Sequence, residues 1–146
     1  MSNFILRPAI ETDAHQIRDL IHRVGINPMD LNWRHFVVVE NVDSQFVGCA
    51  QLKPHKDGSL ELASLAVEEE YRRQGVARAL IEHLLAHSPR PLFLMCQPTL
   101  VPFYEKFRFR AIGLKAMPPY FRKISRLIKV LVAFNRDASP AIMRLD

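Results

Sequence analysis

The sequence predicts a single-domain α/β protein with a mixed, mostly antiparallel sheet that contains a central parallel βαβ unit. Residues 60–67, 75–87 and 90–96 follow one another as a strand, an amphipathic helix and a continuously apolar strand, the pattern of a right-handed crossover. Strand-like runs joined by tight turns precede and follow this unit. The length of 146 residues, with 49% hydrophobic and 24% charged residues, suits one hydrophobic core.

The N-terminal part of the domain covers residues 1–59 and begins with a strand predicted at 4–10. A helix follows, because apolar side chains recur on one helical face at Ala14, Ile17, Ile21 and Val24. Thr12 or Asp13 can cap this helix, and Asp13 with Gln16 forms a pattern like a capping box.

Two β-rich runs follow a loop, at 35–41 and 45–52, and together they predict an antiparallel hairpin. Residues 56–59 form a second turn, which leads into the strand at 60–67. The two cysteines, Cys49 and Cys96, lie in apolar strand-like runs, which favours buried thiols over a disulfide.

The strand at 60–67 changes phase in its middle. Its large apolar side chains fall on two parities, with Leu60 and Leu62 on one and Leu65 and Val67 on the other. One extra residue near Ala63 and Ser64 would bring all four to the same face, which is what a β-bulge does. Because bulges are frequent beside functional sites, this strand is a candidate for a binding role.

The domain core at 60–113 ends with a short helix at 101–107, where Pro102 is tolerated in the first turn, and a strand at 110–113. The final part, 114–146, contains an amphipathic helix and a last strand. The helix carries an apolar face (Phe121, Ile124, Leu127, Ile128, Leu131 and Val132) and a basic face (Arg122, Lys123, Arg126 and Lys129). We interpret it as a surface helix that packs its apolar side on the core; binding of nucleic acid or an anionic membrane is the alternative.

The stretch before the helix at 75–87 has the composition of an anion site. The first N–H groups of a helix lack partners and carry the positive end of its dipole. Gly75 lets an anion approach that backbone closely, and Arg72 with Arg73 adds charge, in a chain of net charge +5. The alternative is a turn glycine beside solvated arginines. Neither a P-loop nor a dinucleotide fingerprint is present.

A family resemblance sharpens this prediction. The segments "LASLAVEEEYRRQGVARALIEHLL", "LFLMC" and "FYEKFRF" resemble the acetyl-CoA-binding core of the GNAT N-acetyltransferase superfamily over about residues 60–113. The signature R/Q-x-x-G-x-G/A is matched by Arg72, Gly75 and Ala77. The resemblance implies an acyl-CoA N-acyltransferase fold with helices on both faces of the sheet. It also implies an enzyme that transfers the acetyl group of acetyl-CoA directly to a primary amine, without a metal.

The resemblance implies coenzyme-binding roles for particular residues. Backbone N–H groups would cradle the pyrophosphate at Gln74, Gly75, Val76, Ala77 and Arg78, with Arg72 and Arg73 supplying charge around them. The strand backbone at Leu65, Ala66 and Val67 would pair with the pantetheine arm. Gln97 stands where many members have an asparagine that reaches the pantetheine.

Two catalytic roles also follow from the resemblance. Tyr104 occupies the position of a tyrosine that donates a proton to the departing thiolate; the alternative is a core tyrosine among Phe103, Phe107 and Phe109. Glu61 lies where some members place a general base, and its alternatives are a solvated strand glutamate or a base formed by a relayed water. Arg108 stands where the family commonly has glycine, and Glu69 where it commonly has proline.

The acceptor is expected to be the amine of a small molecule or peptide, and no nucleic acid or membrane partner is expected. Trp33 and His35 are candidates to line its pocket, although Trp33 can equally fill the core. The late basic helix falls where family members vary and often cover the acceptor site, and we interpret it as a lid or as a contact in a homodimer. A non-catalytic coenzyme-binding module is the other alternative. No signal peptide, membrane span or metal-ligand set is recognised, so a cytoplasmic protein is expected.

Overall fold

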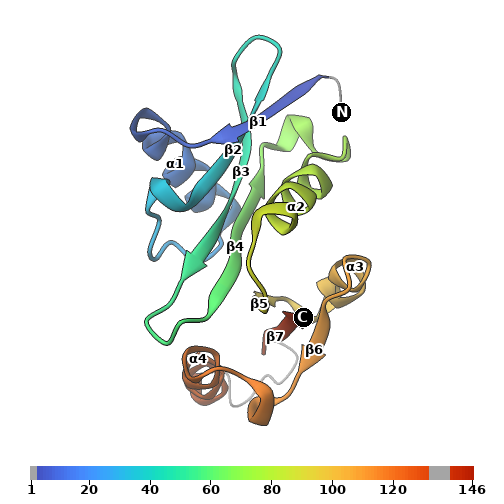
Figure 1. The fold of residues 1–146 in the computed structure, drawn as a ribbon. Coiled ribbons are helices and arrows are strands. Elements are labelled where there is room, and N and C mark those ends of the chain that lie inside the picture. The colour runs from blue at the N-terminus through green and yellow to red at the C-terminus, as the bar shows by residue number, and fades with distance from the viewer. Residues whose placement is uncertain (1–2, 132–138) are drawn as a thin grey trace. The chain divides into compact units, whose positions relative to one another are not determined.

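A computed structural model describes residues 3–131 and 139–146 of the chain (Figure 1). Hydrogen bonds join seven strands in the order β1-β2-β3-β4-β5-β7-β6, with a parallel pairing of β4 and β5 beside an antiparallel pairing of β5 and β7. The predicted mixed sheet with a central parallel pair is therefore confirmed. The chain divides into two compact units, one made of residues 1–53 and 62–88 and the other of residues 54–61 and 89–146.

The first unit contains four strands and two helices. Its strands are β1 (Phe4–Pro8), β2 (Phe36–Asn41), β3 (Phe46–Pro54) and most of β4 (Leu60–Val67), and its helices are α1 (Ala14–Val24) and α2 (Val76–His87). β2 pairs with β1 and with β3 in antiparallel fashion, which confirms the predicted hairpin. The apolar stripe of α1 packs on the sheet in one cluster (Ile17, Leu20, Ile21, Phe36, Val38, Cys49 and Ala66).

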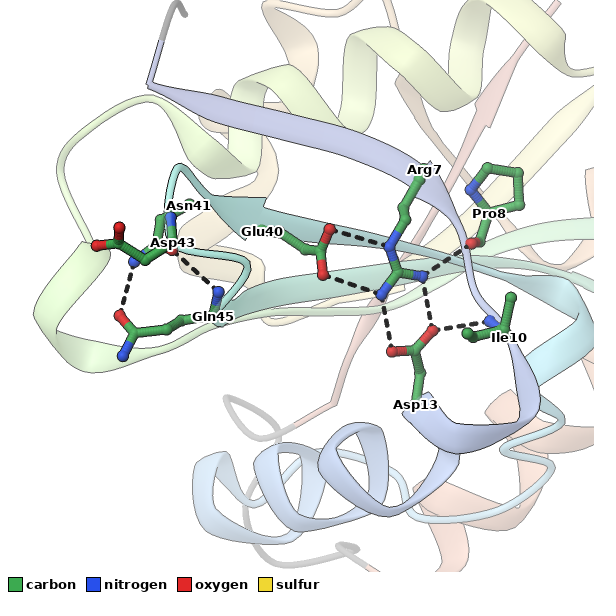
Figure 2. Close-up of polar contacts among 8 residues, drawn as sticks. All are labelled: Arg7, Pro8, Ile10, Asp13, Glu40, Asn41, Asp43 and Gln45. Carbon is green, nitrogen blue, oxygen red and sulfur yellow. Dashed lines mark hydrogen bonds and ion pairs between the residues drawn. The ribbon is translucent and has the colours of Figure 1, made fainter.

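Arg7 ties β1 to β2 and to the start of α1 (Figure 2). Its guanidinium donates to both carboxylate oxygens of Asp13, at 2.8 and 3.0 Å, and lies 3.1 Å from Glu40 Oε1. The Asp13 carboxylate also accepts from the backbone N–H of Ile10 at 2.7 Å. Asp13 precedes α1 but makes no side-chain cap, so the predicted capping role is wrong. The reason is that its oxygens are already used by Arg7 and Ile10.

The second unit begins with residues 54–61, which include the turn and the start of β4. It continues with β5 (Leu92–Cys96), α3 (Val101–Glu105), β6 (Arg110–Ile112), α4 (Pro119–Leu131) and β7 (Ala141–Leu145). β4 pairs with β5 in parallel at Glu61 and Phe93, as the βαβ pattern predicts. Phe93, Met117, Phe121 and Ile142 form the core cluster of this unit.

Short 3-10 helices connect several elements: η1 (Glu11–Asp13), η2 (Trp33–His35), η3 (Glu69–Tyr71), η4 (Pro98–Leu100) and η5 (Leu114–Ala116). The predicted late helix is present as α4, while Val132 and the rest of its predicted end lie outside the described residues. Phe121 is fully buried, whereas Leu127 and Leu131 are 53% and 75% exposed. Ile124 and Ile128 of the same face are half-buried, so the predicted packing of the apolar face on the core is correct for part of α4. In the described part of the chain, every helix falls short of the length and apolarity that a bilayer crossing requires.

Candidate active site

β4 is irregular at the predicted place. Ser64 has φ +58, in the left-handed region that an extended strand does not use. Its hydroxyl accepts from Gln51 Nε2 at 2.8 Å, and its carbonyl oxygen lies 3.8 Å from the Cys49 thiol, so β3 holds the irregular residue. This local break matches the extra residue that the strand's change of phase predicts near Ala63 and Ser64.

β3 and β4 also approach each other closely just after this point. A Cβ atom added to Gly48 would lie 2.8 Å from the carbonyl oxygen of Ala66, closer than a real side chain can stand to backbone. Glycine at position 48 therefore allows β3 to lie close to the β4 segment Leu65–Val67, which the family resemblance assigns to the pantetheine arm.

The start of α2 has the geometry that an anion site needs. Gly75 occupies the N-cap with φ 82, a left-handed conformation that glycine adopts without strain. No side chain caps the helix, so its first N–H groups are not covered by one. Arg72, Arg73 and Gln74 precede it and are exposed. That an anion approaches the backbone at Gly75 stays a prediction.

Two side chains of the same loop brace it against its own backbone. Arg72 Nε donates to the carbonyl oxygen of Val67 at 3.1 Å, and Gln74 Nε2 donates to that of Glu70 at 3.3 Å. Arg23 adds an ion pair to Glu68 at 2.6 Å. Arg72 therefore links the loop to the end of β4, a structural role that the sequence pattern did not reveal.

Glu61 lies in the second unit and is buried, with 6% of its surface exposed. The Nε2 of His55 is 2.8 Å from Glu61 Oε1, and the two side chains are only 6% and 7% exposed. The His55 ring stacks on Tyr120, with centroids 3.6 Å apart and an interplanar angle of 16°. A solvated strand glutamate is therefore the wrong description of Glu61. His55 was missed, although the turn at 56–59 that brings its chain back toward Glu61 is visible in the sequence.

Tyr104 is 9% exposed and packs edge-on against Phe103 and Phe109, at centroid distances of 5.1 and 6.2 Å. Burial raises the pKa of Tyr104 to about 12, and the thiol of Cys96 adds to the effect. The phenol is consequently protonated at neutral pH and is a hydrogen-bond donor. The aromatic neighbours expected of a core tyrosine are present, and they are what desolvates this hydroxyl.

Gln97 and Arg108, close to Tyr104 in the sequence, differ from the residues that the family commonly has at these positions. Arg108 has φ 72, so the common glycine at its position is explained by a left-handed backbone. Gln97 is exposed and precedes η4, where its carbonyl oxygen accepts from the Leu100 N–H at 2.9 Å. The structure thus places Gln97, Tyr104 and Glu61 in one unit and the β4–α2 residues from Leu65 to Arg78 in the other.

The remaining candidates have structural partners. Trp33 packs against the α1 core cluster, and the Arg34 guanidinium lies 4.5 Å from its ring centroid, whereas His35 is half-buried. Cys49 and Cys96 are both free and buried, as predicted. Within residues 3–131 and 139–146, the structure groups no three His, Cys, Asp or Glu side chains in a way that could hold a metal ion.

The family model for the acetyltransferase (GNAT) domain matches residues 32–111, more than half of the chain. This chain belongs to the GNAT acetyltransferase family. The GNAT match includes every predicted site residue from Trp33 to Tyr104. It also includes His55, the partner of Glu61.

Curated GNAT relatives include serotonin N-acetyltransferase from Mesocricetus auratus, 35% identical over 85 residues, and from Homo sapiens, 34% identical over 85 residues. Each alignment covers 53% of this chain and 41% of the relative, so the chain matches less than half of their length.

Solved GNAT-fold structures cover nearly the whole chain. Neisseria gonorrhoeae N-acetylglutamate synthase, complexed with coenzyme A and N-acetyl-glutamate, has a TM-score of 0.76 at 20% identity, over 97% of this chain and 34% of that one. Mycobacterium tuberculosis Rv2747, in complex with CoA and NLQ, has a TM-score of 0.71 at 18% identity, over 97% and 98% of the two chains. At these identities the likeness establishes the fold, and the predicted acyl-CoA N-acyltransferase fold is confirmed.

Proposed function

We propose that residues 1–146 form one N-acetyltransferase domain that transfers the acetyl group of acetyl-CoA directly to a primary amine. Membership of the GNAT family supports this activity. The observation that carries it is Gly75, which opens α2 in a left-handed conformation with no side-chain cap and exposed arginines before it. A backbone-built anion site at that place suits the pyrophosphate of a coenzyme.

The coenzyme contacts follow the same geometry. The N–H groups at Gln74, Gly75, Val76, Ala77 and Arg78 would bind the pyrophosphate, while Arg73 adds attraction. Arg72 acts first through its bond to Val67, and its exposed guanidinium is also available to phosphate. Backbone groups of Leu65, Ala66 and Val67, together with Gln97, would hold the pantetheine arm.

In the proposed reaction, Glu61 accepts a proton from the acceptor ammonium, and the freed amine attacks the thioester carbonyl carbon. A carbon–nitrogen bond forms and the carbon–sulfur bond breaks, with its electron pair leaving on sulfur. Tyr104 donates its proton to that sulfur and regains one from solvent. The nitrogen, which still carries one extra proton after the attack, loses it to solvent, and Glu61 releases the proton that it accepted, so the reaction yields the amide, the free thiol and one net proton. The burial of Glu61 and Tyr104 keeps both groups away from bulk water, which strengthens their interactions with charge that develops during the reaction.

The acceptor in this proposal is the amine of a small molecule or a peptide. α4, with its exposed Leu127 and Leu131, is the candidate element for covering the acceptor or for a homodimer contact. A cytoplasmic location fits the two free thiols, Cys49 and Cys96.

Acetyl-CoA binding and turnover test the proposal separately. Millimolar acetyl-CoA should raise the melting temperature, because a ligand that binds only the native state stabilises it. Thiol release above the hydrolysis background should then depend on an added amine from a panel. Absence of a thermal shift would exclude acetyl-CoA as the ligand, whereas a shift without amine-dependent release would identify a non-catalytic binding module.

A further inference from the structure

The buried face of β3 changes from apolar to polar along its length. Cys49, Gln51 and Lys53 alternate along the strand and so point to one face, and Cys49 belongs to the core cluster beneath α1. Gln51 and Lys53 are as inaccessible as that core, with 0% and 4% of their surface exposed. Polar groups in such a place are unfavourable unless each donor and acceptor is matched. Their partners therefore indicate what the site is built to hold.

Gln51 has an acceptor without a donor. Its Nε2 donates to Ser64 Oγ at 2.8 Å and to the carbonyl oxygen of Asp30 at 3.4 Å. The second contact fixes the orientation of the amide, since a carbonyl oxygen cannot donate. Gln51 Oε1 is then left buried with no hydrogen-bond partner among the described residues. A ligand N–H or O–H is the group that would complete it.

The ammonium group of Lys53 has a single hydrogen-bond acceptor and no anionic partner among the described residues. Its Nζ donates to the carbonyl oxygen of Met29 at 3.2 Å. Among the residues that the structure describes, no carboxylate comes within ion-pair distance of it, although it is nearly inaccessible. An ammonium group has three N–H donors, so one carbonyl leaves it under-matched, and a carboxylate would match both its charge and its donors.

The two unmatched groups lie under one loop and beside one strand break. The carbonyls of Met29 and Asp30 contact them from the loop that follows α1, and Gln51 also bonds Ser64 of β4. Ser64 immediately precedes Leu65–Val67, the segment that the proposed function assigns to the pantetheine arm. All of these residues belong to the first unit. A ligand held here is thus adjacent in the strand to the donor-binding segment.

We propose that Gln51 and Lys53 form a recognition subsite for an acceptor amine that carries a carboxylate, such as an amino acid. This inference rests on the proposed acetyl transfer and specifies its substrate class. The carboxylate of the acceptor pairs with Lys53 Nζ in competition with the Met29 carbonyl, and an N–H of the same molecule donates to Gln51 Oε1. The single ammonium of Lys53 balances one carboxylate. Gln51 Oε1 lies on the same face of β3, so the pair selects a molecule whose carboxylate and N–H group are close together.

Matched acceptor pairs test the subsite. Amino acids and their decarboxylated amines are compared as substrates in the thiol-release assay, and the amino acids alone are compared in thermal-shift titrations without acetyl-CoA. Wild-type protein should acetylate at least one amino acid with a kcat/KM about tenfold or more above that of its decarboxylated partner, and the same amino acid should raise the melting temperature.

Two variants locate the effect. Lys53→Met, which keeps the length of the side chain, should abolish the preference for the carboxylate and the shift caused by the amino acid, while the acetyl-CoA shift persists. Gln51→Leu should weaken the amino acid in the same assays. Lys56→Met removes an exposed lysine of the neighbouring turn and should change nothing.

The outcomes separate the two proposals. Acetylation of decarboxylated amines only, or a carboxylate preference that survives Lys53→Met, would overturn the subsite and leave acetyl transfer intact. Loss of every acetyl-CoA response would overturn acetyl transfer. The amino-acid titration without coenzyme would still show whether Lys53 binds a carboxylate.

Discussion

His55 and Glu61 form a buried imidazole–carboxylate pair, with Nε2 and Oε1 separated by 2.8 Å. The face of the imidazole stacks on the ring of Tyr120, and the ring of Phe121 makes an edge contact with it. Asp57 completes the arrangement, because its carboxylate accepts the backbone N–H of Tyr120 at 2.9 Å. The orientation of Glu61 is consequently set by α4 as well as by its own strand.

Glu61→Gln should lower kcat by about 100-fold or more, because the amide cannot accept the proton of the acceptor ammonium. The change is nearly isosteric, so the acetyl-CoA thermal shift should persist. Steady-state kinetics with any accepted amine measures the effect. Glu11→Gln, an exposed and distant change, is the control. Wild-type kcat in Glu61→Gln would assign the base to a relayed water instead.

His55→Ala should lower kcat by about tenfold while leaving the KM for acetyl-CoA within about twofold. The imidazole orients Glu61 and does not itself take the acceptor proton in the proposed reaction. The fall in kcat without a change in the KM for acetyl-CoA distinguishes this role from simple loss of structure. An unaltered kcat with a lowered melting temperature would reduce His55 to a packing residue. His22→Ala on the exposed surface of α1 serves as the control.

Tyr104→Phe should reduce kcat by about 100-fold without loss of acetyl-CoA binding, because the proton donor to sulfur is removed. Burial places the pKa of Tyr104 at about 12, so the phenol keeps its proton below that pH. Any decline of the wild-type rate below about pH 10 must then come from another group. Tyr71→Phe, which removes a hydroxyl bonded to Asn41, tests whether loss of any tyrosine hydroxyl has the same effect. Unchanged turnover in Tyr104→Phe across the pH range would exclude the acid role.

Gly48→Ala should destabilise the fold by about 1–3 kcal/mol and weaken acetyl-CoA binding, because the new methyl group forces the Ala66 carbonyl away. The added Cβ would lie 2.8 Å from a backbone oxygen, so no side-chain rearrangement can relieve the clash and the backbone must move. Denaturant unfolding and coenzyme titration measure the two effects. Gly113→Ala is the matched control, since an added Cβ there meets nothing within 4 Å. Equal behaviour of the two variants would show that β3 and β4 separate freely.

Asp13→Asn should destabilise the protein by about 2 kcal/mol at neutral pH, because it removes the negative charge and one of the two oxygens that accept from Arg7 and Ile10. Hydrogen bonds from Arg7 lower the pKa of Asp13 in the folded state. Its contribution is therefore complete above the unfolded pKa of about 3.9 and is lost as the pH falls through the lower folded value. The difference between wild type and variant in urea unfolding should shrink with acidification. A difference that is constant with pH would contradict the ion-pair explanation.

Periodicity and turn chemistry were sufficient for most of the fold. The helical spacing before Gly25, the hairpin turn after Asn41 and the apolar run ending at Cys96 are local patterns, and each matches an element of the structure. The change of phase in β4 also placed the irregularity at Ser64 correctly, because alternation in a strand leaves little freedom for a misplaced residue.

The partners of charged side chains were not predictable in the same way. Asp13 reads as a cap in the sequence, yet its carboxylate accepts from Arg7 of β1, which also donates to Glu40 of β2. His55 becomes a partner of Glu61 only because a turn and the distant Tyr120 hold its ring. Gln51 and Lys53 were not singled out from the sequence, because their burial depends on a loop whose position no local pattern specifies.

The thiol of Cys49 lies against the carbonyl of Ser64, and burial raises its pKa to about 12. Only the thiolate reacts with alkylating reagents, so the closed protein should resist iodoacetamide. Modification of Cys49 would then require β3 and β4 to part locally, and its rate would measure how often they do. The alkylation rate of Cys49 is thus a direct measure of local opening at the strand that holds Ser64.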